Sequence, residues 1–278
     1  MRKFFNTNFN TDSDELIEVF DELPFWAASF GIKLFESIVV KKNITALDIG
    51  FGAGFPLTEL AMRLGNSCRV YGIDPWEAAI KRTEKKLDIY RINNVKIING
   101  VAENIPLPDN SIDLIVSNNG INNVSDLDRV LNECSRIAKS GAQFVQTMNT
   151  QNTMHQFYEI MVEVLSNKKM DNEIESVQRH IYEKRRPLDE ICKKLKENSF
   201  GIKDIVTDKF EYKFADADAM FDYFPIAFYF LSGWKKMVPQ DRAEEVFDEI
   251  TMRINKIADR QGYFKLTVPF AVIDCRKN

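Results

Sequence analysis

The stretch Leu47-Asp48-Ile49-Gly50-Phe51-Gly52-Ala53-Gly54 decides the fold of this chain. It joins an apolar run, residues 45–49, to a glycine-rich turn, and a helical pattern follows over residues 56–64. Glycines between a strand and a helix let a ligand approach the backbone closely. Tight turns of this kind also use glycine for steric reasons alone, so the turn by itself does not specify a ligand.

Strand-forming and helix-forming runs alternate around this turn. The strand runs are apolar nearly from end to end, as expected when helices cover both faces of a parallel sheet. The alternation predicts an α/β fold, a doubly wound Rossmann-like sheet. Strands are expected at residues 45–49, 69–73, 95–98, 112–116 and 143–148, with helices at 56–64, 77–90 and 127–139.

The outer parts of the chain are mainly helical. An amphipathic helix is predicted over residues 23–41, and beyond residue 149 the pattern predicts helices at 153–165, 174–182 and 188–198 and strands at 202–214 and 264–274. A helical insert, about residues 216–259, lies between those two strands, and no Gly/Ser linker isolates it. We therefore expect one domain over 1–278, with a helical lid at 1–42, a core at 43–150 and the remaining elements at 151–278.

Composition and charge exclude several classes of protein. The chain has 278 residues, 45% hydrophobic and 28% charged, which is typical of globular proteins. Its 37 basic and 41 acidic residues give no basic footprint for nucleic acid, so no nucleic-acid partner is expected. Cys68, Cys134, Cys192 and Cys275 lack the paired spacing of a metal or redox site, and no metal is expected. No apolar run suits a signal peptide or membrane span, so we expect a cytoplasmic protein.

Asp74 follows the second predicted strand, about twenty residues beyond the last glycine. A carboxylate there can accept both hydroxyls of a ribose, and it can also cap a helix beginning at Pro75. The ring of Trp76 can stack on an adenine. The turn lacks the GxGxxG spacing that places a pyrophosphate at a helix N-terminus, and Asp48 makes its entry acidic. This combination favours a cationic ligand.

Three segments resemble the class I S-adenosylmethionine-dependent methyltransferases: LDIGFGAG at 47–54, YGIDPW at 71–76 and GVAENIPLPDNSIDLIVSNNGINNV at 100–124. The likeness covers roughly residues 43–149, and the middle portion is similar to the small-molecule branch that includes the ubiquinone and menaquinone C-methyltransferases. The resemblance implies seven strands, mostly parallel, with the last antiparallel. It also implies S-adenosyl-L-methionine as cofactor and S-adenosyl-L-homocysteine as product.

The resemblance also implies individual cofactor contacts. The glycine-rich turn would wrap the methionine part, Asp74 would bind the ribose, and Ala102 and Glu103 would hold the adenine. The family often has Asp where this chain has Val101, so the adenine contact would rest more on Glu103. Asp113 matches an acidic residue with a structural role. The predicted cofactor-binding residues are Asp48, Gly50, Phe51, Gly52, Gly54, Asp74, Pro75, Trp76, Ala102, Glu103 and Asn118.

The sequence does not identify a catalytic residue, and His155, Asn118 and Asn119 are the candidates. The asparagine-rich segment 118–123 could be a loop whose side chains cap its own backbone. Alternatively, Asn118, Asn119 or Asn122 could orient the acceptor or the sulfonium, because the loop leaves the carboxyl end of the sheet. His155 is expected to begin a helix at the same end and could serve as a base. An amine, thiolate or activated carbon acceptor needs alignment and a dry pocket rather than a base.

Two further segments could contact an acceptor. Residues 219–238 hold more aromatic side chains than a small cap needs, and these form either a core or an apolar acceptor pocket. The basic stretch 179–187 is either a solvated helix end or a contact for an anionic substrate group. The predicted substrate contacts are Trp26, Phe30, Asn119, Asn122, His155, Phe224 and Phe228.

We therefore expect methyl transfer from S-adenosylmethionine to a small, apolar or aromatic acceptor by in-line displacement. One alternative is a non-enzymatic S-adenosylmethionine-binding sensor or partner subunit. Another is an NAD-dependent oxidoreductase, which shares the glycine turn and Asp74 but does not predict Ala102-Glu103 or the PLPDNSIDLI segment. The net charge disfavours an RNA or protein methyltransferase. The acceptor, the methylated atom and the oligomeric state stay open.

Overall fold

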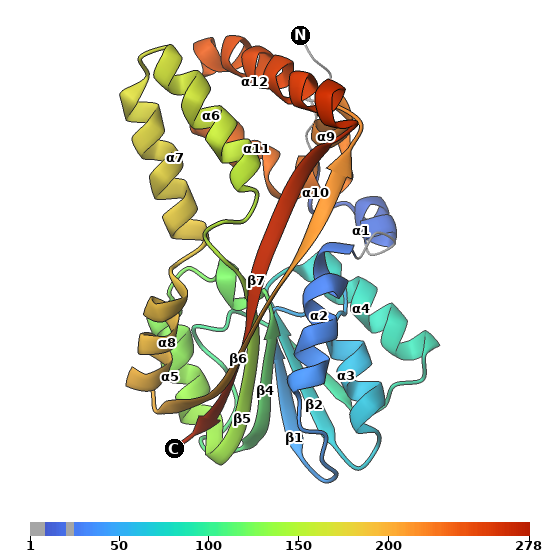
Figure 1. Ribbon diagram of the computed structural model, residues 1–278. Helices are drawn as coiled ribbons and strands as arrows, with labels where there is room; N and C mark the ends of the chain where they lie inside the picture. The colour runs from blue at the N-terminus through green and yellow to red at the C-terminus, as the bar shows by residue number, and fades with distance from the viewer. Residues whose placement is uncertain (1–8, 21–24) are drawn as a thin grey trace. The chain divides into compact units, whose positions relative to one another are not determined.

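A computed structural model describes residues 9–20 and 25–278, and the chain forms two compact units in it. The first, here the sheet unit, comprises Asn10–Asn149, Pro187–Asp208 and Phe270–Asn278. The second, the helical unit, comprises Thr150–Arg186 and Lys209–Pro269 together with Phe9. Strands β6 (Phe200–Phe214) and β7 (Phe264–Lys277) each run from one unit into the other (Figure 1). The single domain expected over 1–278 stays a prediction.

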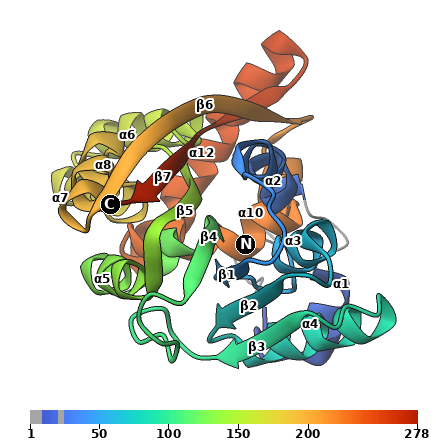
Figure 2. The ribbon, with the colours of Figure 1, turned by 90° about the horizontal axis from the view of Figure 1, so that it is seen from below.

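One seven-stranded sheet organises the fold. Its order is β3-β2-β1-β4-β5-β7-β6 (Figure 2). The first five strands in that order pair in parallel, and β7 runs antiparallel to β5. The predicted fold class is confirmed. The other strands are β1 (Thr45–Ile49), β2 (Arg69–Asp74), β3 (Val95–Asn99), β4 (Ile112–Asn118) and β5 (Ala138–Asn149).

Helices cover both faces of the sheet unit, with α2, α3 and α4 on one face and α5 and α8 on the other (Figure 2). This explains why β1 and β4 are apolar: four of the five side chains of β1 are buried, and Asp48 is the only polar one among them. The sequence did not predict α1, whose buried side chain is Ile17. These helices are α1 (Asp14–Phe20), α2 (Phe25–Ser37), α3 (Leu57–Leu64), α4 (Glu77–Ile89), α5 (Leu127–Ile137) and α8 (Leu188–Glu197).

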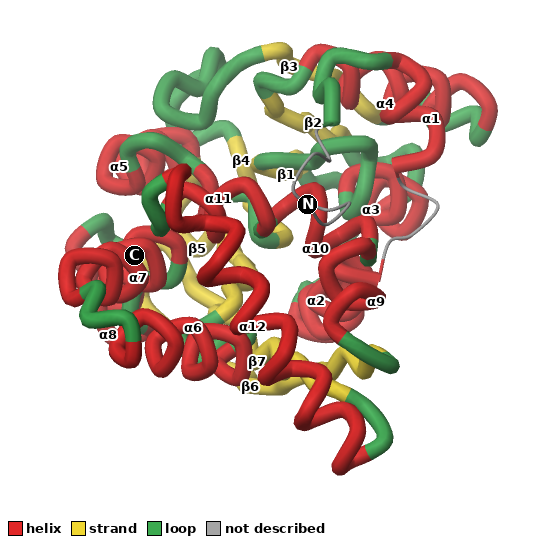
Figure 3. Tube along the Cα trace, turned by 90° about the horizontal axis from the view of Figure 1, so that it is seen from above, coloured by secondary structure: helices red, strands yellow, loops and turns green. Residues whose placement is uncertain are grey.

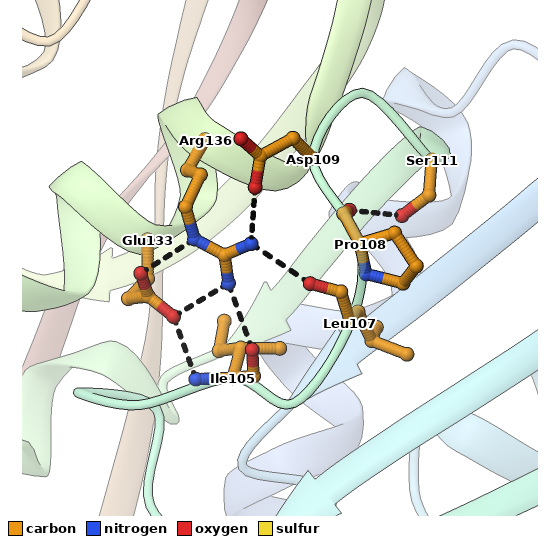
Figure 4. Close-up of polar contacts among 7 residues, drawn as sticks. All are labelled: Ile105, Leu107, Pro108, Asp109, Ser111, Glu133 and Arg136. Carbon is orange, nitrogen blue, oxygen red and sulfur yellow. Dashed lines mark hydrogen bonds and ion pairs between the residues drawn. The ribbon is translucent and has the colours of Figure 1, made fainter.

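Arg136 of α5 fixes the loop between β3 and β4 (Figure 4). Its guanidinium donates hydrogen bonds to the carbonyls of Ile105 and Leu107, both at 2.8 Å, and to the carboxylate of Asp109 at 2.7 Å. Glu133 orients the guanidinium and accepts a 2.7 Å hydrogen bond from the Ile105 amide. Loop carbonyls need donors because no strand satisfies them, so the PLPDNS segment is held by one side chain.

The helical unit packs around aromatic rings. Trp234 is fully buried and stacks on Phe157 with 3.8 Å between ring centroids, and Phe221 contacts both rings edge-on. The predicted helical insert is present as the four helices α9 to α12, labelled in Figure 3. The helices of this unit are α6 (His155–Asn167), α7 (Asp171–Lys184), α9 (Ala217–Asp222), α10 (Phe224–Tyr229), α11 (Leu231–Lys236) and α12 (Gln240–Gln261).

Ion pairs join two helices of this unit. Lys168, just after α6, contacts Glu245 and Glu249 of α12, and Arg253 of α12 reaches Glu163 of α6. Over residues 9–20 and 25–278, no helix is both long enough and apolar enough to cross a membrane.

Candidate functional site

The glycine-rich turn follows β1 and uses its glycines for two different purposes. Gly50, Gly52 and Gly54 have φ of +78°, +51° and +110°, a region that side chains rarely allow. A β-carbon on Gly50 would lie 2.6 Å from the α-carbon of Gly120, so this glycine permits close packing. A β-carbon on Gly52 would have no heavy atom of the described residues within 4 Å. The turn is therefore open at Gly52, where a ligand can reach the backbone.

Side chains from β2 and α4 hold this turn in place. A carboxylate oxygen of Asp74 accepts a 2.8 Å hydrogen bond from the Gly52 amide. Thr83 Oγ1 donates to the Gly52 carbonyl at 3.1 Å, and Lys86 Nζ donates to the next carbonyl, that of Ala53, at 2.6 Å. Burial lowers the pKa of Lys86. The sequence pattern does not single out Thr83 and Lys86, because helical periodicity does not show which loop a helix face meets.

Asp74 does not cap a helix, which corrects one of the two roles considered for it. Helix α4 begins at Glu77, two residues later than a cap at Asp74 would require. The second carboxylate oxygen instead accepts a 2.8 Å hydrogen bond from the Trp76 amide. Burial raises the pKa of Asp74, while the amides of Trp76 and Gly52 oppose that rise. Asp74 is thus a buried acceptor at the carboxyl end of β2, where a ribose-binding residue was predicted.

Asp48 is a fully buried carboxyl group on β1. Neither of its oxygens accepts a hydrogen bond of normal geometry from the described residues, although the Leu57 amide lies near enough to act on the carboxyl group electrostatically. Burial raises the pKa of Asp48 well above its usual value, and the charge of Asp74 raises it further, against a weaker opposing effect of the Leu57 amide. A buried carboxyl without partners is costly, so such groups indicate functional sites. The pair Asp48 and Asp74 suits a ligand that brings positive charge and hydrogen-bond donors.

The residues predicted around the adenine occupy two places in the sheet unit. Trp76 donates from Nε1 to the Thr11 carbonyl at 2.9 Å, and its ring meets Phe20 of α1 edge-on at 5.2 Å. Pro75 is exposed. Phe51 is buried, and its ring lies beside Gly72, whose added β-carbon would be 2.8 Å from it. Adenine stacking on Trp76 stays a prediction.

Glu103 supports the segment ahead of α5. Its Oε1 accepts hydrogen bonds from the amides of Ser125 at 2.8 Å and Asp126 at 3.1 Å, and the neighbouring Ala102 is buried. Asp126 in turn caps α5 through the Arg129 amide. Glu103 thus has a structural role beside the predicted adenine contact. Asp113 is structural as expected, since it accepts hydrogen bonds from the Thr45 amide and from Lys139.

Asn118 at the end of β4 is engaged on both sides of its amide. Its Nδ2 donates to the Ala27 carbonyl of α2 at 2.9 Å, and its Oδ1 accepts from Thr147 Oγ1 of β5 at 2.9 Å. The side chain is 8% exposed. Asn118 therefore ties α2 to the sheet, and its role is to position neighbouring groups.

Asn119 keeps a buried donor without a partner. Its φ is +61°, and its Oδ1 accepts a 2.7 Å hydrogen bond from Asn122 Nδ2. Its Nδ2 is buried and unpartnered among the described residues. Asn122 Nδ2 also donates to Oδ1 of Asn149, at the end of β5, at 3.4 Å. Asn149 was not predicted as a site residue, although its place at the carboxyl end of a strand could have indicated it. The loop is both a self-capped turn and the holder of one free amide donor.

The predicted acceptor contacts divide between the units. In the sheet unit, Phe30 is fully buried against Phe270 at 4.9 Å, and Trp26 is half-buried beside it. In the helical unit, Phe224 and Phe228 stack at 5.4 Å, with Phe9 edge-on to both. His155 is the first residue of α6, and its Nδ1 lies 3.3 Å from the Asn152 carbonyl oxygen. Their contact with an acceptor stays a prediction.

Sequence comparison matches residues 47–146 to a family described as "Methyltransferase domain". The demethylmenaquinone methyltransferase of Geobacillus stearothermophilus is 36% identical over 121 residues, 44% of this chain and 52% of that protein. The enzyme of the same name from Staphylococcus carnosus is 28% identical over 152 residues, 54% of this chain and 61% of that protein. The chain spans about half the length of the curated relatives it matches.

Solved structures share the fold at low sequence identity. The YcgJ protein from Bacillus subtilis has a TM-score of 0.59 at 17% identity, covering 90% of this chain and 98% of that one. Geranyl diphosphate C-methyltransferase from Streptomyces coelicolor A3(2), bound to S-adenosyl-L-homocysteine, has a TM-score of 0.55 at 15% identity, covering 100% and 90%. The [4+2]-cyclase SpnF has a TM-score of 0.54 at 14% identity, covering 90% and 80%. Because a cyclase is among them, the fold alone does not fix the reaction.

Proposed function

We propose that this chain, which belongs to the class I S-adenosylmethionine-dependent methyltransferases through residues 47–146, methylates a small-molecule acceptor. The observation that carries this proposal is the glycine turn open at Gly52 beside two buried carboxyl groups, Asp48 and Asp74. S-adenosylmethionine carries no phosphate and bears positive charge, so these two acidic side chains fit it better than they fit a dinucleotide. The NAD-dependent alternative is not favoured.

The residues of the turn have separate tasks in holding this cofactor. Asp74 would accept the ribose hydroxyls, and Asp48 would lie on the side of the cationic methionine part. The hydrogen bond from Gly52 to Asp74 already fixes the carboxylate against the turn, so little reorganisation is needed on binding. When bound, S-adenosylmethionine supplies a methyl group on a sulfonium. Thr83 and Lys86 hold the turn in the conformation that leaves Gly52 accessible.

Catalysis in this proposal rests on alignment and exclusion of water. The free Nδ2 donor of Asn119 would orient a carbonyl or carboxylate oxygen, and Asn118 holds the loop that carries it. A general base is not part of the proposal, although His155 stays the candidate if the acceptor must lose a proton. The acceptor class is small and apolar or aromatic, which is supported by the demethylmenaquinone methyltransferases among the relatives. We retain a cytoplasmic location as part of the proposal.

The test is a methyl-transfer assay with isotope-labelled S-adenosylmethionine and a panel of quinone-like and other aromatic acceptors. Asp74→Ala should abolish transfer. Glu84→Gln, which removes an exposed carboxylate from α4, is the matched control and should keep wild-type activity. Binding of S-adenosylmethionine without transfer to any acceptor would favour the non-enzymatic sensor or partner subunit.

A further inference from the structure

The helical unit buries a positive charge that has no anionic partner among the described residues. Arg185, directly after α7, is only 2% exposed. Within the part of the chain that the structure describes, its side chain makes one hydrogen bond, from Nη1 to the Tyr158 hydroxyl at 3.2 Å. Its Nε is buried without an acceptor among the described residues. No carboxylate of the described chain pairs with it.

A buried guanidinium stays charged, because its pKa lies far above physiological pH, so it cannot escape the free-energy cost of desolvation by losing its proton. Burial of an unpaired charge is strongly unfavourable, so buried arginines are found with carboxylates or phosphates. The aromatic surroundings recover only part of the cost, since the guanidinium carbon lies 5.4 Å and 5.9 Å from the ring centroids of Tyr158 and Phe230. The guanidinium of Arg185 is therefore a buried cation that an oxyanion would stabilise.

The geometry of the Arg185 N–H groups that have no acceptor indicates which anion fits them. With Nη1 bonded to Tyr158, Nε of Arg185 is buried without an acceptor, and no hydrogen bond within the described residues engages Nη2, so the Nε and Nη2 edge is available to a ligand. This edge presents two parallel N–H groups that match two oxygens of a carboxylate or phosphate. It differs from the other basic residues of the stretch, such as Arg179, which is exposed.

Tyr158 adds a third donor. Its hydroxyl oxygen accepts hydrogen bonds from Arg185 Nη1 and from Trp234 Nε1 at 3.0 Å. Both lone pairs are then used, and the hydroxyl hydrogen has no acceptor within the described chain. Tyr158 is 4% exposed, so this donor is buried as well. Residues from α6, the end of α7 and α11 thus converge on one polar point in an aromatic core.

His180 adds no charge to this cluster near pH 7. Its ring lies 6.4 Å from that of Tyr158, and burial, followed by the charges of Arg185 and Lys184, lowers its pKa to about 4. The imidazole is therefore neutral near pH 7. The cluster keeps one net positive charge from Arg185.

We propose that Arg185 and Tyr158 form a binding site within the helical unit for an oxyanion group, a carboxylate or a phosphate, of a small-molecule ligand. This anion site goes beyond the proposed function and does not depend on it. The prediction that the basic stretch 179–187 meets an anionic substrate group is narrowed to a single residue.

The experiment is calorimetric titration of the full chain, without S-adenosylmethionine, with benzoate, inorganic phosphate and pyrophosphate at low ionic strength. At least one anion should bind with saturation. Arg185→Gln should weaken that binding at least about tenfold, as expected for a charge-assisted hydrogen-bonded pair. Tyr158→Phe, which removes only the hydroxyl, should weaken it less, and Arg179→Gln should leave it unchanged. Binding of benzoate alone assigns a carboxylate, and binding of the phosphates alone assigns a phosphorylated ligand.

A second measurement keeps the proposal testable if Arg185→Gln folds poorly. Arg185→Met should raise the midpoint of thermal unfolding, because it removes an uncompensated buried charge while keeping an apolar stem. A purely structural arginine predicts the opposite. Absence of saturable binding for all three anions, or equal binding by wild type and Arg185→Gln, overturns the anion site. Methyl transfer is assayed separately, so anion binding without transfer contradicts only the proposed function.

Discussion

Gly50 and Gly120 pack backbone against backbone at the carboxyl ends of β1 and β4. A β-carbon on Gly50 would lie 2.6 Å from the α-carbon of Gly120, and one on Gly120 would lie 2.2 Å from the Ile49 carbonyl oxygen. Ser117 Oγ donates to that same carbonyl at 2.8 Å. The glycine turn and the asparagine loop are therefore held together with no room for a side chain.

Gly120→Ala should lower the free energy of unfolding by about 1–3 kcal/mol, because overpacking forces the two loops apart. It should also weaken binding of S-adenosylmethionine, since the turn would shift. Urea denaturation and calorimetry measure the two effects. Gly100→Ala is the control, because its nearest heavy atoms would lie 3.9 Å from the added carbon. Equal unfolding midpoints for the two variants would show that the glycine contact is not required.

Asp48→Asn should raise stability at pH 7 by about 1–3 kcal/mol while weakening cofactor binding. The pKa of Asp48 is raised in the folded chain from a usual value of 3.8, so above that pH the folded state holds more protons than the unfolded one. The stability that the extra bound proton gives the folded chain is fully present below pH 3.8, and it is lost as the pH rises through the raised pKa of Asp48. Unfolding midpoints from pH 4 to 8 check this. A variant less stable than wild type at every pH would contradict it.

Acid should destabilise the helical unit through His180. Its pKa is about 4 in the folded chain against 6.5 for an unperturbed histidine, so the unfolded state takes up the proton first. The contribution of neutral His180 to the free energy of unfolding is present above pH 6.5 and is lost as the pH falls to about 4. It amounts to roughly 1–2 kcal/mol, because solvent screens a partly exposed side chain. His180→Gln should flatten this part of the stability curve. An unchanged slope between pH 6.5 and 4 would remove His180 as the cause.

The two neighbouring asparagines should respond differently to substitution. Asn118→Ala breaks hydrogen bonds to α2 and β5 and should cost about 1–3 kcal/mol of stability. Asn119→Gly keeps the left-handed backbone, so it should cost less stability but lower the rate of methyl transfer about tenfold or more. Thermal unfolding and initial rates separate the two. Full activity of Asn119→Gly would exclude its amide from the reaction.

The sequence predicted the elements whose signal is local. The apolar run 45–49 is β1 residue for residue, and the glycines beyond it have the positive φ that a tight turn requires. Helix α4 begins at the predicted residue 77, although Asp74 bonds the glycine turn instead of capping the helix. Other helix boundaries were less accurate, as at α7, which was predicted at 174–182 and spans Asp171–Lys184. Helix α1 was missed because one buried side chain leaves little periodicity.

Tertiary contacts account for what the sequence could not predict. Thr83 and Lys86 lie on an ordinary helix face, and only the packing of α4 brings them to the glycine turn. Likewise, the basic stretch contains several similar side chains. Burial singles out Arg185 and leaves Arg179 exposed, a distinction that composition does not contain.

The most direct test of the central claim is calorimetric titration of the full chain with S-adenosylmethionine, S-adenosylhomocysteine and NAD. The first two should bind to wild type and to Glu84→Gln, neither should bind to Asp74→Ala, and NAD should give no heat. Binding of NAD alone, or S-adenosylmethionine binding that Asp74→Ala leaves unchanged, would contradict the assignment of the glycine turn and Asp74 as its site.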